Sequence, residues 1–320
     1  MNVNNPLPGI GALFSRRRKD DLAKRLFSVF SLMPFLIVLF IILALYLRTR
    51  PILENTSVRE LLTGRVWSPA KGEFGFLPFI AGTLWVTIVA MVLAVPVCLL
   101  CAIYLVEYAR SSTRTLMKPL LDLLSGIPSV IYGVWGMIAI VPWVQHFLAP
   151  RLGKWLGVIP LFAVNNPTGF SIISGGIVLA VMVAPVIISV TFEVLHSVPD
   201  GLREASLAVG ATRWQTVKFI VVPKAIPGIM AGVVLGFSRA LGETMAVLMV
   251  VGNVAKVPSS IFDPAYPLPA LIANNYGEIL SIPLYDAALL GGALVLLLIV
   301  LAFNMLSALI LDRIIGRVRQ

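Results

Sequence analysis

The chain has 320 residues, of which 58% are hydrophobic and only 12% are charged, and its mean hydropathy is +0.95. A soluble domain of this length cannot withdraw so much apolar surface from water, which excludes a soluble enzyme, a disordered chain and a secreted disulfide scaffold. The net charge of +10 would favour nucleic acid in a soluble protein, but we expect no nucleic-acid partner here, because lipid must solvate most of the chain.

Six apolar runs are long enough to cross a bilayer core, which takes about 20 helical residues. The sequence therefore predicts an all-α membrane protein with six transmembrane helices. We place these helices at residues 27–47, 79–106, 120–148, 171–195, 225–251 and 285–311. The first run is longer than a signal-peptide core and has no small-residue cleavage site, so we expect it to be retained as an anchor.

The segments between the runs differ in character. A basic segment (1–26) precedes the first run, a mixed-charge loop (48–78) follows it, and a short tail (313–320) ends the chain. The loop 252–284 contains five prolines, which argue against a regular helix there.

Lys and Arg are unevenly shared between the two sides that six spans define. Sixteen of the 25 lie on the side of the two termini, eight lie on the other side, and Arg239 lies inside the fifth span. Because cytoplasmic loops carry the excess of positive charge, we expect both termini in the cytoplasm.

The third run carries small and polar residues at helical spacing. One arc of about 100° on a helix over 120–148 would hold Asp122, Ser125, Gly126, Ser129, Gly133 and Gly136. Pro128 is expected to kink or break this helix. The arc favours either a polar pathway or a seam of close helix packing, and Asp122 can simply be solvated at the cytoplasmic end.

The loop before the fifth span, residues 198–223, predicts a short helix followed by a turn. Asp200 can cap the helix, Gly210 can end it, and Glu204 lies in its first turn. One surface is kept small by Ala205, Ser206 and Ala208. Such a helix beside the membrane suits insertion into a groove on another protein, and the alternative is a surface helix packed on its own chain.

The fifth span contains two charges. Arg239 lies about 22 Å along the helix from Lys224, and Glu243 follows one turn later on the same face. The same stripe contains Gly228, Gly232 and Gly236. Because an Arg near mid-membrane costs at least about 2.5 kcal/mol, we favour an aqueous anion pathway in which Glu243 sets the geometry of Arg239. The alternative is a glycine packing seam in which the two charges neutralise each other.

Three stretches of the sequence resemble a known family. Residues 204–223, with Glu204-Ala205, Gly210 and Pro223 at the family spacing, are similar to the EAA loop of binding-protein-dependent ABC permeases. Ser206 replaces the second Ala of that motif. Residues 238–247 and 126–136 resemble the phosphate permease subunits of the PstC type. The resemblance covers roughly residues 75–312.

The resemblance implies the permease core of a type I importer of inorganic phosphate in the cell inner membrane. The implied partners are a second permease subunit of the PstA type, two copies of a cytoplasmic ATPase and an extracytoplasmic phosphate-binding protein. The residues assigned to ATPase coupling are Glu204, Ala205, Ser206, Ala208 and Gly210. The chain has no phosphate-binding loop of its own, so we expect a transport subunit, not an enzyme, with no cofactor and with ATP used by the partner. We expect no metal, because His146 and His196 are isolated.

Three other functions remain open at this stage. The same machine can carry another oxyanion, such as sulfate or molybdate. An ion-coupled secondary transporter would use Glu243 as its proton site, but it would need inverted repeats and would leave the loop 198–223 without a role. A membrane scaffold without transport activity would leave Arg239 unexplained.

Overall fold

The computed structural model describes residues 10–276 and 284–318, which are mostly helical. Six helices in these residues are long and apolar enough to cross a membrane, which confirms the predicted all-α fold with six spans. They are Ala23–Asn55, Leu77–Tyr108, Ser129–Leu156, Ile172–His196, Arg213–Leu241 and Tyr285–Arg313. The ends of the expected segments 1–26 and 313–320, together with Pro283 and Arg319, lie outside the described residues.

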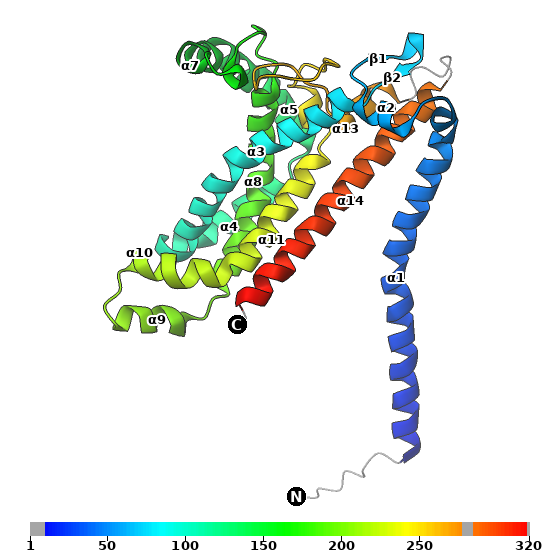
Figure 1. Cartoon of the computed structure of the whole chain (residues 1–320). Coiled ribbons are helices and arrows are strands. Elements are labelled where there is room, and N and C mark those ends of the chain that lie inside the picture. The colour runs from blue at the N-terminus through cyan, green and yellow to red at the C-terminus, as the bar shows by residue number, and fades with distance from the viewer. Residues whose placement is uncertain (1–9, 277–283, 319–320) are drawn as a thin grey trace, which may run out of the picture.

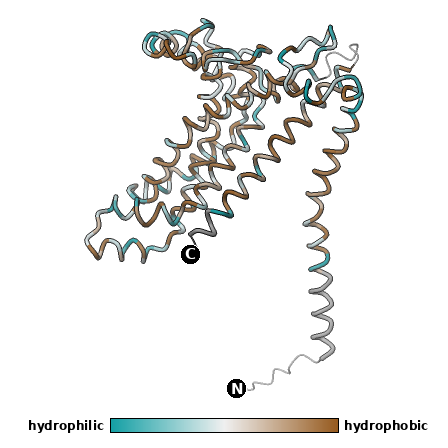
Figure 2. Tube along the Cα trace, viewed as in Figure 1, coloured by the Kyte–Doolittle hydropathy of each residue, from teal (hydrophilic) through white to brown (hydrophobic). Residues whose placement is uncertain are grey.

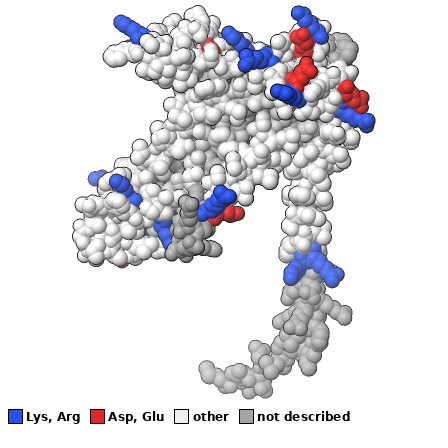
Figure 3. Space-filling view, in the orientation of Figure 1, with Lys and Arg blue, Asp and Glu red and all other residues white. Residues whose placement is uncertain are grey.

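The charges and the apolar residues are separated along the bundle. Figure 2 shows apolar residues along the lengths of the helices, and Figure 3 shows Lys, Arg, Asp and Glu gathered at the two ends of the bundle. The band between the ends shows no charged side chain on the face drawn in Figure 3, and lipid can solvate such a surface.

Helix α1 (Ile10–Asn55) stands apart from the bundle over most of its length (Figure 1). No residue of its most apolar window is buried, and Phe27 is 74% exposed. Close to the other end of α1, Thr49 and Ile52 are buried where the helix packs against α14 (Tyr285–Val318). An apolar groove of about 440 Å³ remains between α1, α2 and α14.

A small cap follows α1. It consists of α2 (Val58–Thr63), β1 (Trp67–Ser68), the 3-10 turn η1 (Pro69–Lys71) and β2 (Glu73–Phe74). The two strands are antiparallel, with Trp67 opposite Phe74. The Trp67 ring also lies 5.9 Å from the Phe76 ring and 5.0 Å from the Phe79 ring, measured between centroids. This aromatic cluster holds the cap on the first turns of α3.

Helix α8 (Ile172–His196) is the centre of the bundle, packed between α3 (Leu77–Ile103) and α11 (Val222–Leu241). Glycines allow this close approach: a Cβ added to Gly176 would lie 2.5 Å from Val89 of α3. As a result, 72% of the most apolar window of α8 is buried within the chain. Small residues and close packing take the place of a hydrophobic driving force between helices in lipid.

The third span differs from the expected helix over 120–148. Helix α4 ends at Ser125, residues 126–128 are not helical, and the membrane-crossing helix begins at Ser129. Pro128 explains the break, because it lacks an N–H and disfavours the helical conformation of Ile127. The pieces are α4 (Ser111–Ser125), α5 (Ser129–Trp135), π-helix η3 (Gly136–Ile140), α6 (Val141–Trp143), π-helix η4 (Val144–Leu148) and α7 (Ala149–Leu156). The single arc from Asp122 to Gly136 is therefore wrong.

The fifth span also ends earlier than expected. Its parts are α10 (Arg213–Thr216), π-helix η6 (Val217–Val221) and α11 (Val222–Leu241). The helix stops at Leu241, residues 242–244 are irregular, and a short helix, α12 (Met245–Leu248), follows. The expected continuous helix to residue 251 is wrong. The loop helix α9 (Asp200–Ala208) lies before α10, clear of the bundle in Figure 1.

The end of the bundle opposite α9 is closed by two long loops. The first contains the 3-10 turn η5 (Pro160–Phe162), and the second contains α13 (Leu268–Asn275). Helix α13 corrects the expectation that prolines exclude a helix from 252–284. Pro267 precedes it and Pro269 lies in its first turn, where a missing N–H leaves no helical bond unmade.

The second loop caps the start of α8. The backbone N–H groups of Ile172 and Ile173 donate to the carbonyls of Asp263 and Ile261, at 3.0 and 2.9 Å. The Asp263 carboxylate accepts hydrogen bonds from Ser259 N–H (2.9 Å) and from the Ser260 N–H (3.0 Å). Burial raises the pKa of Asp263, but these hydrogen bonds outweigh burial and lower its pKa below the ordinary value. The loop is thus anchored by a carboxylate that favours its charged form.

Candidate functional site

Arg239 lies in the last turn of α11, and its side chain is half-buried. Its guanidinium is close enough to the Tyr132 hydroxyl of α5 for a charge interaction. Tyr132 donates a hydrogen bond of 2.9 Å to the carbonyl of Leu124, at the end of α4. Arg239 therefore acts electrostatically on the side chain that bridges the break between α4 and α5.

Glu243 does not pair with Arg239. It lies beyond the end of α11, and its Oε1 accepts a hydrogen bond of 3.0 Å from the backbone N–H of Ala246 in α12. The expected spacing of one turn on a shared face is wrong, because Gly242 ends the helix and the carboxylate satisfies a free N–H at the start of the next one. Among the described residues, no carboxylate forms an ion pair with Arg239.

The predicted polar residues of the third span occupy two helices. Ser125 ends α4 and donates back to the carbonyl of Leu121 at 2.9 Å, while Ser129 begins α5. Asp122 is exposed on α4 and forms no ion pair within the described residues. Ser125 and Ser129 lie on either side of the break. These two hydroxyl groups are therefore close to the break and not on one face of a continuous helix.

The two helix breaks lie close together because α5 packs on α12. A Cβ on Gly133 of α5 would lie 3.1 Å from Cα of Ala246 and 2.7 Å from the sulfur of Met249. Both breaks, 126–128 and 242–244, fall inside apolar stretches. Irregular backbone at membrane depth is tolerated where protein buries it or where it lines a water-filled cavity. The two breaks therefore bring irregular backbone from two segments of the chain near to each other.

The three glycines of α11 face α8. A Cβ on Gly228 would meet Val194 at 2.4 Å, one on Gly232 would meet Val190 at 3.1 Å, and one on Gly236 would meet Ile187 at 2.5 Å. This contact sets the rotation of α11 and with it the direction in which Arg239 points. The glycine packing seam and a polar role for Arg239 were alternatives in the sequence, but α11 can provide both.

The residues predicted for coupling lie on or just after α9. No residue of α9 is buried, and Glu204, Ala205 and Ala208 are exposed. Ser206 is half-buried, with 2.9 Å between its hydroxyl and that of Thr216 in α10. The helix presents its free surface away from the bundle (Figure 1).

Gly210 shapes the turn between α9 and α10. Its φ is +88°, in the region that favours glycine, and no atom lies within 4 Å of where its Cβ would be. Glycine is therefore favoured at position 210 by the backbone conformation and not by a lack of space for a side chain. Thr212 then begins α10 in a reciprocal capping arrangement with Gln215.

Sequence reasoning missed Glu107, Arg114 and Arg203. The structure places Arg203 of α9 3.0 Å from the Glu107 carboxylate at the end of the second span. Glu107 was open to detection, because it is the only charged residue between positions 77 and 108. In the sequence, Arg203 and Arg114 are only two of the positive charges of the loops.

A second ion pair joins α4 to α8, with 2.6 Å between Lys118 Nζ and Glu193 Oε1. The hydrogen bond to Glu193 raises the pKa of Lys118. Both side chains are more than half exposed. Solvent therefore weakens this pair, in contrast with the pair formed by Arg203.

Six helices in the described residues that are long and apolar enough to cross a membrane define a multi-pass membrane protein. Residues 94–320 match the binding-protein-dependent transport system inner membrane component family, and the chain belongs to this family. It is a permease subunit of an ABC transport system in the inner membrane, and so a transport component and not an enzyme.

Relatives cover most of the chain. The phosphate transport system permease protein PstC of Xylella fastidiosa is 38% identical over 251 residues, which span 78% of this chain and 77% of that protein. The PstC protein of Haemophilus influenzae is 33% identical over 303 residues, spanning 94% and 95%. A chain of a bacterial alginate ABC transporter, solved with an alginate-bound periplasmic protein, has the same fold, with a TM-score of 0.57, 17% identity and coverage of 91% and 93%.

Proposed function

We propose that the chain is the permease subunit of an ATP-driven importer that carries inorganic phosphate into the cytoplasm. The observation that carries this proposal is the similarity to phosphate transport system permease proteins, at 38% identity over 251 residues and 33% over 303. The longer match spans 94% of the chain, so the likeness is not confined to a general transporter core.

The proposed path passes the two helix breaks, with Arg239 as its positive group. An anion in a low-dielectric passage needs a compensating charge. Arg239 has no carboxylate partner among the described residues, so its guanidinium is available for two hydrogen bonds to one phosphate. Ser125 and Ser129 add hydroxyl groups beside the break. Asp122 is exposed in the last turn of α4, one turn before the break, and Glu243 supports the path through its hydrogen bond to α12.

Three kinds of partner complete the proposed importer. A second permease subunit of the PstA type would close the path and supply another basic residue, because one guanidinium does not balance a doubly charged ion. Two copies of a cytoplasmic ATPase would supply ATP hydrolysis, and an extracytoplasmic protein would deliver phosphate.

The ATPase is proposed to bind α9, where Glu204, Ala205 and Ala208 leave a small exposed surface. A cysteine at Ala208 should crosslink to the ATPase subunit. Gly210→Asp should abolish uptake while the chain still inserts, because a residue with a Cβ is strained at a φ of +88° and the substitution adds a negative charge to the turn. Normal assembly and coupling in Gly210→Asp would contradict this assignment.

Both termini are proposed to lie in the cytoplasm, together with α9. The described ends of α1 and α14 lie on the same side as α9 in Figure 1. Reporter fusions at residues 115 and 210 should report the cytoplasm, and fusions at 60, 160 and 265 should report the opposite side. A cytoplasmic signal at residue 160 would contradict the arrangement.

Another oxyanion is the second candidate substrate, because a guanidinium also binds sulfate and molybdate. The test reconstitutes the chain with its partner permease, ATPase and binding protein in liposomes, and measures uptake of radiolabelled phosphate with and without ATP. We expect ATP-dependent uptake that excess unlabelled phosphate abolishes and excess sulfate or molybdate leaves unchanged. Uptake of sulfate or molybdate without phosphate uptake would replace the proposal by the second candidate.

A further inference from the structure

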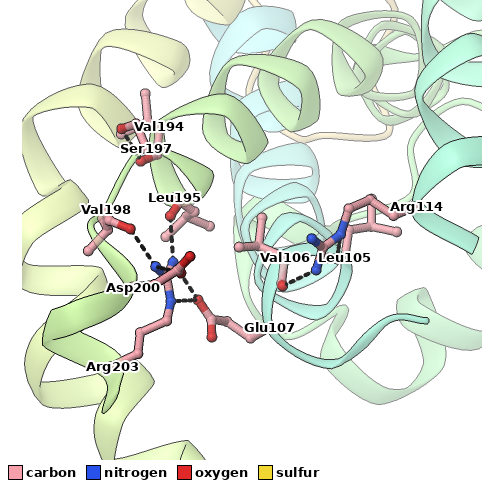
Figure 4. A network of polar contacts seen from close by, with 10 residues as sticks. All are labelled: Leu105, Val106, Glu107, Arg114, Val194, Leu195, Ser197, Val198, Asp200 and Arg203. Carbon is pink, nitrogen blue, oxygen red and sulfur yellow. Dashed lines mark hydrogen bonds and ion pairs between the residues drawn. The ribbon is translucent and has the colours of Figure 1, made fainter. Parts of the chain in front are cut away.

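Arg203 lies where three segments of the chain meet (Figure 4). Its Nε and Nη2 both donate to Oε1 of Glu107, at 3.1 and 3.0 Å, and Nη2 also donates to the carbonyl of Leu195 at 2.8 Å. Its Nη1 donates to the carbonyl of Val198 and to Oδ1 of Asp200. These contacts use every N–H direction of the planar guanidinium.

The pair of Arg203 and Glu107 is protected from water. Their side chains are 15% and 7% exposed, whereas Asp200 at the rim is 87% exposed. The carbonyls of Leu195 and Val198 lie at the end of α8, where a helix attracts a cation. A lysine has one ammonium group with three donors, so it cannot hold all of these acceptors in one plane.

Glu107 belongs to the π-helix η2 (Tyr104–Tyr108), which ends the second span. A second arginine binds the same turn from another helix. Arg114 of α4 donates to the carbonyls of Leu105 and Val106, at 3.2 and 2.5 Å. Two arginines, one from α9 and one from α4, therefore hold one five-residue turn between them (Figure 4).

Helix α9 is otherwise weakly attached to the bundle. It has no buried residue, and its other polar contact to a neighbouring helix is the 2.9 Å contact between the hydroxyls of Ser206 and Thr216. The Arg203 contacts are its polar link to η2 and α8 among the described residues. From the same turn, Arg114 leads into α4, which ends at the break beside Tyr132 and Arg239.

We propose that Arg203, Glu107, η2 and Arg114 form a clamp that transmits displacement of α9 to α4 and so to the break at 126–128. Arg203 and Arg114 are positioning residues for transport in this assignment, because they act through η2 and touch no substrate. The clamp rests on the proposed function, since it takes α9 as the surface that the ATPase moves.

The test measures the ratio of phosphate uptake to ATP hydrolysis in liposomes holding the complete transporter. The double variant Arg203→Gln/Glu107→Gln removes both charges, so no unpaired charge is left buried. We expect it to assemble and hydrolyse ATP, with a ratio reduced about tenfold, which is within the usual size of coupling between two sites. Arg114→Gln should lower the ratio less, because η2 keeps its link to α9.

Arg203→Lys covers the case in which the double variant does not assemble. It keeps the positive charge at the end of α8 but loses the planar fork, so its ratio should still fall, by about threefold or more. The matched control is Arg50→Gln/Glu54→Gln, which removes an ion pair within α1 whose side chains are 67% and 62% exposed. Its ratio should equal that of the wild type.

Two outcomes would overturn the clamp. One is a wild-type ratio in the assembled double variant. The other, if the double variant does not assemble, is a wild-type ratio in Arg203→Lys. Failure of the proposed function looks different, because the wild-type complex itself would then show no ATP-dependent phosphate uptake.

Discussion

Helices α1 and α8 have nearly the same hydropathy and opposite surroundings. Their most apolar windows have mean hydropathies of 2.8 and 2.5, yet none of the α1 window and 72% of the α8 window is buried within the chain. The difference lies in side-chain size. Helix α8 presents Gly175 and Gly176 to its neighbours, whereas α1 presents large exposed side chains such as Phe27 and Phe40.

Hydropathy therefore predicts that a helix enters the membrane but not what it contacts there. Lipid is as apolar as a leucine side chain, so helices associate where small residues allow their surfaces to meet closely. The bulky surface of α1 is suited to lipid or to another subunit. Gly176 of α8 instead lets α3 approach closely, and the glycines of α11 let α8 approach closely.

The strongest test of this difference enlarges one small residue in each helix. Gly176→Leu should destabilise the chain by about 3 kcal/mol or more and leave little folded protein, because even a Cβ there would lie 2.5 Å from Val89. Ser31→Leu on the exposed face of α1 should change the free energy of unfolding by less than about 0.5 kcal/mol. Thermal unfolding of the purified chain in detergent measures the stability of both variants. Equal losses of stability would contradict the proposed difference between α8 and α1.

The second test compares charges in the two regions. Arg239→Gln should reduce phosphate uptake to background at unchanged assembly, and Arg239→Lys should also impair it strongly, because an ammonium cannot make the same two hydrogen bonds. Arg50→Gln in α1 should leave uptake unchanged. The measurement is uptake at matched membrane abundance. Near wild-type uptake by Arg239→Gln would leave Arg239 as a packing contact.

The third test concerns the loop that caps the start of α8. Among the described residues, no loop caps α1 in this way. The hydrogen bonds that lower the pKa of Asp263 mean that the folded chain binds this proton more weakly than the unfolded chain. The stabilisation is therefore complete above the ordinary value of 3.8 and is lost as the pH falls below it through the folded pKa.

Asp263→Asn should accordingly cost about 1.5 kcal/mol at neutral pH and make the acid side of the stability profile shallower. Glu54→Gln, which breaks the exposed ion pair of α1, should cost less than about 0.5 kcal/mol. Unfolding of the purified chain between neutral pH and pH 3 measures both variants. An unchanged acid profile in Asp263→Asn would contradict the role of the carboxylate.

The smallest test uses one hydroxyl in each helix. Thr191 of α8 is buried, and its Oγ1 has no hydrogen-bond partner in the described structure, whereas Thr49 Oγ1 of α1 donates to the carbonyl of Leu45 at 2.7 Å. Thr191→Val keeps the shape and removes the unpaired group, so it should stabilise the chain by about 1 kcal/mol. Thr49→Val should give no gain. A lower unfolding temperature for Thr191→Val would show that its hydroxyl has a partner.

The six spans could be predicted because apolar length is a property of the local sequence. The positions where helices stop could be predicted only in part. Pro128 marks its own break, but nothing comparable marks Leu241, where Gly242 and the hydrogen bond from Ala246 to Glu243 end one helix and begin another. Extending the helical period past that point placed Glu243 on the wrong face.

The clamp was out of reach of sequence reasoning for a different reason. Arg203 and Glu107 are 96 residues apart, and their contact exists because η2 packs on α8 and Arg203 reaches both of them from α9. A charged residue such as Glu107 near the end of an apolar run predicts a partner of opposite charge. The sequence does not indicate which of the loop arginines is that partner. Only the packing of the helices selects Arg203.

The π-helix η6 lets the fifth span hold one residue more than a regular α-helix without changing the rotation of α11 relative to α10. A π turn holds one residue more than the α-helix that would otherwise fill it, and each helical residue turns the chain by about 100°. Deleting one residue from Val217–Val221 should therefore turn η6 into regular α-helix and leave Gly232 against Val190. The regular helix between Val222 and Gly228 has no such extra residue. Deleting one residue there should rotate the rest of α11 by about 100° and turn Gly232 away from Val190.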